Sequence, residues 1–196
     1  MTHADWPVEL RGVTESVVTT LGPNGLWNVA VLGLHAGNDD NRDDDPITAR
    51  TWGNTRTRRN FHRRGGGVVQ FTRDPVDFAE AALSIREEAE SVLDSADAWV
   101  EIEAEQIGAG ETDGTRWEEW ELTPVESEVR KRRVLLTNRG FAAVVEATVA
   151  ASRLGVEGYD SSELRTRLDY FEEVARTCGG ERESAAFDRI RELAEW

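Results

Sequence analysis

The chain has 196 residues, of which 39% are hydrophobic, and it carries a formal net charge of −15 at pH 7. This length suits one domain, or a small domain with an appendage, and the apolar fraction with seven tryptophans excludes wholesale disorder. No apolar run approaches the roughly 18 residues that span a bilayer, and the first ten residues lack the layout of a signal peptide. A single cysteine, Cys178, cannot form an internal disulfide, so we expect a soluble cytoplasmic protein.

Arginine replaces lysine almost throughout the chain. Lys131 is the only lysine among 23 basic residues, and these face 38 acidic residues. An acid-rich, lysine-poor composition resembles that of soluble proteins from salt-loving archaea, which suggests a halophilic archaeon as the source. The acidic stretch at 38–46 is interpreted as a solvated loop, because it lacks the glycine-centred turn and the final glutamate of a calcium-binding loop.

The first half of the chain predicts strands and turns. Two apolar runs flank Pro23-Asn24-Gly25, and Asn-Gly is a strong signal for a hairpin turn. Both faces of the second run are largely apolar, as expected in a barrel. Further strands are predicted at 47–52 and 67–72, and Asp74-Pro75 then predicts the start of a helix that runs through Leu83.

The second half begins with strands and ends with helices. Strands are predicted at 98–107 and 115–130, with a turn at Asp113-Gly114. Apolar residues then recur with a helical period, which predicts three helices: one from about Thr137 to Gly155, one from Asp160 to Gly179-Gly180, and one that carries Phe187, Ile190 and Leu193. We therefore predict a β-rich domain at 1–135 and a helical segment at 136–196.

Several kinds of site are excluded by the motifs that are missing. The chain has no phosphate loop, no dinucleotide-binding glycine triplet and no nucleophile elbow. The residues His3, His35, His62 and Cys178 show no paired ligand spacing, so we expect no metal site. We interpret His62 as a polar surface group and Cys178 as a buried small side chain, and no residue stands out as a catalytic acid, base or nucleophile.

An arginine-rich tract at 49–69 raises three alternatives: a nucleic-acid patch, a salt-bridge network, or a pocket for one small anion. Arginine forks pair with phosphate oxygens, and hydroxyl groups add neutral donors, so the anion pocket would use Arg50, Thr55, Thr57 and Asn60. The net charge of −15 opposes a polyanion, which makes nucleic acid unlikely. We expect Arg58, Arg59, Arg63 and Arg64 to pair with surface acids instead.

A second basic tract, Arg130–Arg133, keeps an RNA interpretation open. We favour a plainer interpretation, in which this tract is a hinge that forms ion pairs with Glu126 and Glu128.

Blocks along nearly the whole chain resemble a known family. It is the largely archaeal "domain of unknown function 447" family, whose fold resembles the FMN-binding split β-barrel of flavin reductases. The blocks are Glu15–Thr20, Asn28–Gly33, Arg50–Phe61, Asp74–Pro75 with Phe78, Asn138–Arg139, Glu146–Ala147, Ser152–Leu154 and Gly179–Glu183. Arg58 stands where the family pattern has an aromatic residue, and Gln70 where it has asparagine.

The resemblance implies an α+β fold, a split β-barrel followed by a C-terminal three-helix segment, that binds FMN at a homodimer interface. It implies that Arg50, Thr55, Thr57 and Asn60 hold the phosphate with help from Arg56, and that the flavin ring lies near Thr19, Thr20 and Asn28. The protein would be a flavin-dependent oxidoreductase of unknown substrate, with a nicotinamide or deazaflavin electron donor. The alternatives are a non-catalytic flavin carrier or sensor and, less favoured, an RNA-associated protein.

Overall fold

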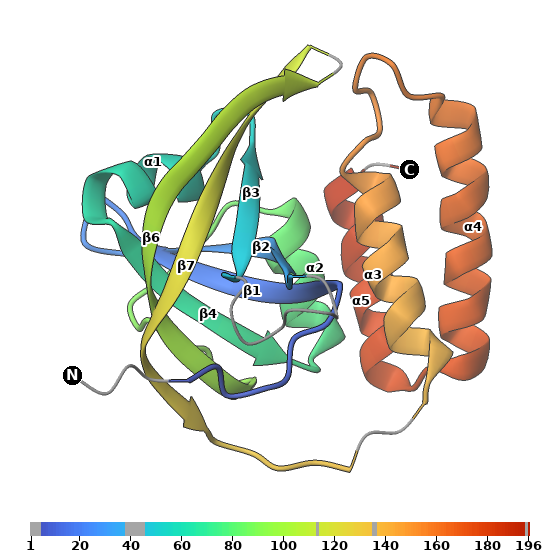
Figure 1. Ribbon diagram of the computed structural model, residues 1–196. Coiled ribbons are helices and arrows are strands. Elements are labelled where there is room, and N and C mark those ends of the chain that lie inside the picture. Colours follow the sequence, from blue (N-terminus) through green and yellow to red (C-terminus); the bar gives the residue numbers. More distant parts are fainter. Residues whose placement is uncertain (1–4, 38–45, 113, 135–136, 195) are drawn as a thin grey trace. The chain divides into compact units, whose positions relative to one another are not determined.

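The computed structural model describes most of the chain (Figure 1). The described residues are 5–37, 46–112, 114–134, 137–194 and 196. His3 and nearly all of the acidic stretch at 38–46 lie outside them, so the interpretation of that stretch as a solvated loop is not addressed by the structure.

Seven strands form one sheet. They are β1 (Val13–Leu21), β2 (Trp27–His35), β3 (Thr48–Trp52), β4 (Gly66–Thr72), β5 (Arg86–Glu88), β6 (Ala96–Thr112) and β7 (Thr115–Val129). The strands lie in the order β1-β4-β6-β7-β3-β2-β5. An additional pairing of β1 with β2 closes all of these strands except β5 into a barrel. The long, curved β6 and β7 form one wall of the barrel.

The predicted strands are confirmed, and local chemistry explains where they turn. Gly25 adopts φ of +81° between β1 and β2, which a residue with a side chain rarely does. β1 and β2 then pair along their whole length, so that Thr20 lies opposite Asn28. β2 and β3 pair only through Leu34–Ala49 and His35–Thr48.

Five helices complete the fold. They are α1 (Arg56–Arg64), α2 (Pro75–Leu83), α3 (Arg139–Ala151), α4 (Ser161–Cys178) and α5 (Glu181–Ala194). Asp74 and Asp160 cap α2 and α4 as predicted, since each side chain accepts hydrogen bonds from two backbone N–H groups. α3 ends at Ala151 rather than at the predicted Gly155.

Helix α1 is not among the elements that the sequence predicts. The signals were nevertheless present. Thr55 caps the N-terminus by accepting a hydrogen bond from the Arg58 backbone N–H, and Gly65 ends the helix with φ of +70°. The last turn carries three basic residues, His62, Arg63 and Arg64, and positive charge there interacts favourably with the negative end of the helix dipole.

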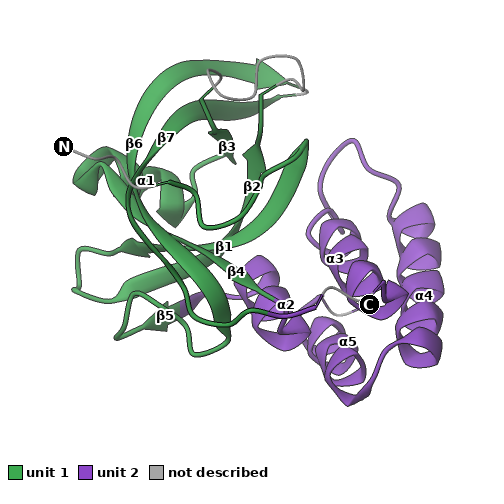
Figure 2. Cartoon of the chain, turned by 60° about the horizontal axis from the view of Figure 1, so that its bottom comes forward, with its two compact units in different colours: residues 1–72, 87–132 green, residues 73–86, 133–196 purple. Residues whose placement is uncertain are grey.

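The chain divides into two compact units, which Figure 2 colours separately. One unit comprises residues 1–72 and 87–132, and the other comprises residues 73–86 and 133–196. The predicted boundary near residue 135 would leave 73–86 with the barrel, whereas α2 groups with the C-terminal helices. α2 does so because Ala79 belongs to the same buried cluster as Val144, Leu168 and Phe187.

Each unit has its own apolar core. The barrel core includes Val18, Leu34, Phe61, Val100, Ile102 and Trp120, and the helical core is rich in alanine. Among the described residues, no helix is long and apolar enough to cross a membrane.

Candidate functional site

A polar pocket lies between the β1–β2 turn and helix α1. Its volume is about 310 Å³, and we call it the hairpin pocket. Its lining residues are Gly22, Pro23, Asn24, Asn28, Arg56, Arg59, Asn60, Arg63 and Glu87. Three arginines and three amide side chains face one carboxylate here, so the pocket is suited to an anion.

The fold of the barrel fixes one wall of the hairpin pocket. Asn60 is buried, and its amide Nδ2 donates to the Thr20 hydroxyl oxygen at 3.0 Å and to the Thr20 carbonyl at 3.3 Å. The Arg63 guanidinium donates to Asn60 Oδ1 at 2.7 Å. Three predicted cofactor residues, Asn28, Arg56 and Asn60, line this pocket, and Thr20 supports them from β1.

Two of the predicted residues carry polar groups that the fold itself does not use. Asn28 is only 6% exposed and Thr57 only 5% exposed. Among the described residues, neither side chain has a hydrogen-bond partner. Neither side chain has a polar atom that is enclosed without a partner, so these polar atoms keep contact with solvent and are available to a ligand.

Glu87 occupies one side of the hairpin pocket. Its carboxylate accepts a hydrogen bond from Arg56 at 3.0 Å and from the Asn24 amide at 3.3 Å. It therefore connects the β1–β2 turn to α1 and fixes the position of the Arg56 guanidinium.

Arg50 and Thr19 lie in other surroundings. Arg50 Nε donates to Glu119 at 3.1 Å, and its guanidinium stacks 4.6 Å above the Trp117 ring, so both contacts are with β7. Thr19 is fully buried. Its hydroxyl donates to the Ser91 carbonyl at 2.5 Å and accepts from the Gln70 amide at 3.1 Å, so Thr19 fastens the loop that carries Ser91 to the barrel.

His62 and Arg58 share one buried carboxylate. His62 Nε2 lies 2.8 Å from Glu118, and Arg58 lies 2.5 Å from the other oxygen of that group. Burial alone would raise the pKa of Glu118, but the hydrogen bonds and charges of Arg58 and His62 outweigh it and lower that pKa below its usual value. His62 is exposed, as expected of a polar surface group, and its ring also packs edge-on against Trp120.

A second pocket lies on the other side of α1. Its volume is about 610 Å³, and we call it the loop pocket. Its lining residues are Gly53, Asn54, Arg58, Arg59, His62, Gly114, Thr115 and Arg116. None of the predicted cofactor residues lines the loop pocket, and Arg59 belongs to both pockets.

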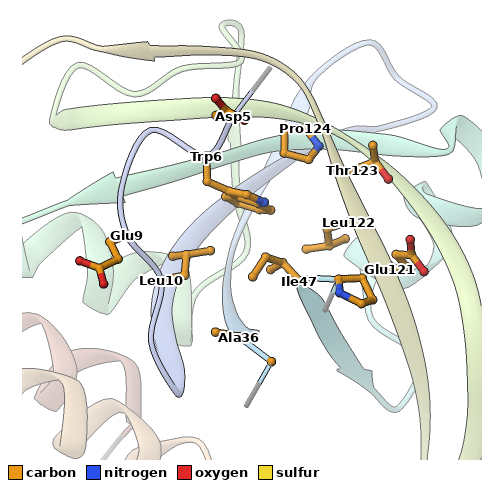
Figure 3. A pocket seen from close by; sticks show the side chains of 12 residues that line it. Asp5, Trp6, Glu9, Leu10, Ala36, Ile47, Glu121, Leu122, Thr123 and Pro124 are labelled. Atoms are coloured by element: carbon orange, nitrogen blue, oxygen red, sulfur yellow. The ribbon is translucent and has the colours of Figure 1, made fainter. Parts of the chain in front are cut away.

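A third pocket, of about 580 Å³, has an apolar floor and an acidic rim. Figure 3 shows Trp6 and Leu10 of the N-terminal segment near Ile47 and Leu122. The charged residues that line it are all acidic: Asp5, Glu9 and Glu121. These carboxylates make it a poor site for a phosphate group.

Two sequence interpretations need correction. Of the four arginines expected to pair with acids, only Arg58 does so within the described part of the chain, whereas Arg59 and Arg63 line pockets. In the second basic tract, Arg130 donates to the Leu93 carbonyl and Lys131 to the Asp94 carbonyl, instead of pairing with Glu126 and Glu128.

Cys178 is partly exposed rather than buried, and its sulfur accepts a hydrogen bond from Arg139. Within the described ranges there is no group of three or more His, Cys, Asp or Glu residues that could hold a metal ion.

Sequence reasoning missed three residues that shape the site. Glu87 and Arg63 position Arg56 and Asn60, and Gln70 binds Thr19, Ser91 and the Leu93 backbone N–H. Gln70 was noted only as a departure from the family pattern. Its position at the centre of an apolar run, "VVQFT", is the signal that a buried amide is needed there.

Comparison with known proteins identifies similar chains. Residues 14–131 match the family model described as "Protein of unknown function (DUF447) N-terminal domain", and residues 138–192 match "Protein of unknown function (DUF447)". An FMN-bound DUF447 protein from Methanosarcina mazei is 25% identical, with a TM-score of 0.78 over 94% of this chain and 96% of that one. This similarity confirms the predicted split barrel followed by a helical segment.

Two further structures are similar over part of the chain, at lower scores. Nitrilotriacetate monooxygenase component B from Bacillus cereus is 18% identical, with a TM-score of 0.44 over 61% of this chain and 71% of that one. Flavoredoxin from Methanosarcina acetivorans is 10% identical, with a TM-score of 0.41 over 67% and 79%.

Proposed function

Because the chain belongs to the DUF447 family, which its sequence resembles, we propose that it binds FMN and acts as a flavin-dependent oxidoreductase. The observation that carries the proposal is the likeness to the FMN-bound relative, which extends over almost the whole of both chains. The hairpin pocket agrees with the proposal, because Asn28, Arg56 and Asn60, which the family resemblance assigns to the cofactor, all line it.

In this proposal the phosphate binds at the start of α1, beside the hairpin pocket. Arg56 supplies a guanidinium, and Thr55 and Thr57 supply hydroxyl groups next to backbone N–H groups that an α-helix leaves unpaired in its first turn. Asn60 holds the pocket wall, and Arg50 would take part only if its bond with Glu119 is exchanged for one with the phosphate.

The remainder of the cofactor would lie toward Asn28. A volume of about 310 Å³ is at the small end of the range for ligand pockets, so the hairpin pocket would hold only part of an FMN molecule. A second copy of the chain would cover the rest, which is why we propose a homodimer with the flavin at its interface. Thr19 and Thr20, whose hydroxyl groups bond within the barrel, would support the site.

The bound flavin would supply the electron or hydride chemistry. The chain's own contribution would be to bind and orient the cofactor. Asn28 would donate or accept at the ring edge, and the arginines would neutralise the phosphate.

The binding proposal is tested with apoprotein titrated with FMN and with riboflavin, by following flavin fluorescence. FMN should bind more than tenfold tighter than riboflavin, because riboflavin lacks the phosphate and each charge-assisted hydrogen bond contributes about 1.5–3 kcal/mol. Arg56→Gln should reduce this preference, whereas Arg64→Gln removes the same charge from an exposed position of α1 and should preserve it. Failure to take up FMN at both low and high salt would refute the proposal.

The oxidoreductase part is tested separately by anaerobic mixing with NADH, NADPH or a reduced deazaflavin. Loss of the yellow colour of the bound flavin is the expected result. A holoprotein that stays oxidised with all three donors would instead support a carrier or sensor.

A further inference from the structure

Helix α1 presents two different polar faces. Arg56, Asn60 and Arg63 recur at i, i+4 and i+7 and line the hairpin pocket, whereas Arg58 and His62, at i and i+4, line the loop pocket. The proposed FMN site uses the first face only. The loop pocket, although larger, has no role in that function.

The loop pocket is cationic in a strongly acidic protein. Its charged lining residues are arginines, with His62 beside them, and the others are glycine, asparagine and threonine. With 38 acidic and 23 basic residues in the chain, a pocket lined by three arginines and no carboxylate departs from the overall composition. Such a lining offers guanidinium, hydroxyl and amide donors of the kind that phosphate oxygens accept.

The three arginines of the loop pocket differ in how many of their guanidinium N–H groups already bond to other protein groups. Arg58 is held by Glu118. One Arg59 nitrogen, Nη1, donates to the backbone and side-chain oxygens of Asn54, which leaves the other guanidinium N–H groups available. Arg116 is 80% exposed, and its ion pair with Glu111 spans 3.8 Å. Arg59 and Arg116 therefore approach from two different segments with donors that the fold does not consume.

We propose that the loop pocket binds the phosphate group of a small molecule other than FMN. The inference rests on the proposed function in one respect, since that function requires an electron donor and nicotinamide dinucleotide donors carry phosphate groups. The same chemistry would also accept free inorganic phosphate. A nucleic acid is disfavoured because the net charge of −15 repels a long polyanion, whereas one phosphate needs only local donors.

The test uses full-length apoprotein with and without FMN, titrated with inorganic phosphate, pyrophosphate and NADP+ by calorimetry. Arg116→Gln alters the loop pocket only, and Arg63→Gln alters the hairpin pocket only. Arg64→Gln is the control for lost charge, because Arg64 lines neither pocket. Arg116→Gln should weaken binding of one of these three probes about tenfold or more and leave FMN affinity within about twofold.

The outcomes separate the two proposals. If the wild-type protein binds NADP+ more tightly than phosphate, and Arg116→Gln abolishes this difference, the ligand is a nucleotide donor. If Arg116→Gln weakens the binding of inorganic phosphate but not of NADP+, the ligand is a free anion. Phosphate binding that survives while FMN fails to bind would refute the proposed function but not this site. Loss of FMN binding in Arg116→Gln, RNA binding that depends on Arg116, or no binding of any probe would overturn the inference.

Discussion

The two units of the chain differ in what they bury. Of the ten buried polar or charged residues in the described part of the chain, nine belong to the barrel unit and one, Thr148, belongs to the helical unit. The Thr148 hydroxyl bonds to the Val145 carbonyl of its own helix, so it serves the helix alone. In the barrel, by contrast, Ser16, Thr19 and Gln70 bond to other segments, whereas Asn28 and Thr57 have no partner within the described residues.

Arginine is also used differently in the two units. In the helical unit Arg176, Arg189 and Arg191 bond to carboxylates at 3.1 Å or less. In α1, Arg56 and Arg58 also bond to carboxylates, but Arg59 and Arg63 bond to amide or carbonyl oxygens and line pockets. Ligand chemistry therefore concentrates in the barrel, and the helical unit is stabilised by an apolar core and surface ion pairs.

The largest expected effect compares two buried phenylalanines. Phe187 in the helical core and Phe61 in α1 each pack edge-on against a tryptophan, Trp196 and Trp120 respectively. Replacing either by alanine should cost about 3–5 kcal/mol of unfolding free energy, measured by chemical denaturation. Under conditions where both variants are folded, only Phe61→Ala should weaken FMN binding, because Phe61 anchors α1 in the barrel. An equal loss of FMN affinity in Phe187→Ala would contradict the expectation that only the core of the barrel unit supports FMN binding.

A smaller effect distinguishes two buried amides of the hairpin pocket. Asn28→Leu removes a polar group without a protein partner, so the apoprotein should keep its stability while FMN affinity falls about tenfold. Asn60→Leu removes bonds to Thr20 and Arg63, so it should cost about 1–3 kcal/mol of unfolding free energy as well. Asn28→Leu that is as unstable as Asn60→Leu would show that Asn28 has a structural role.

The sequence predicted the architecture well for physical reasons that are local. The Pro23-Asn24-Gly25 turn, the period-two strands and the caps at Asp74 and Asp160 each depend on neighbouring residues only. α1 was missed because arginines and threonines weaken an apolar period, and only the cap at Thr55 and the glycine at Gly65 mark its ends.

The candidate site was less predictable because its partners are distant in sequence. Thr20 and Asn60 are 40 residues apart, and Arg56 and Glu87 are 31 apart. Residue type identified Thr57 as a hydroxyl donor for an anion, and Asn28 as a polar group on an otherwise apolar strand, which needs a partner if it is buried. No local pattern could place Arg50 against Trp117 and Glu119, or assign Arg59 to two pockets, because both depend on how the barrel closes.

The smallest expected effect compares Glu118 in the barrel with Glu172 in the helical unit. Arg191 hydrogen bonds lower the pKa of Glu172 against the opposing effect of burial, and Arg176 adds to them. Burial of Glu118 is likewise outweighed by Arg58 and His62, so that its pKa also lies below the model-compound value of 4.5. The unfolded chain then binds more protons than the folded one between the two pKa values of each group. Each carboxylate therefore contributes stability that is fully present above pH 4.5 and is lost as the pH falls through its folded pKa.

Glu118→Gln and Glu172→Gln should each reduce the decrease in unfolding free energy that occurs as the pH falls. The unfolding free energy is measured between pH 3 and pH 6, a range that extends about one to two units on either side of the usual glutamate pKa. Only Glu118→Gln should also change binding in the loop pocket, because Glu118 holds Arg58 and His62 there, whereas Glu172 contacts arginines of the helical unit. An acid slope unchanged in both variants would show that other carboxylates carry the pH dependence. A loop pocket that responds to Glu172→Gln would show that the two units are coupled, and the division between a ligand-binding barrel and a structural helical unit would then fail.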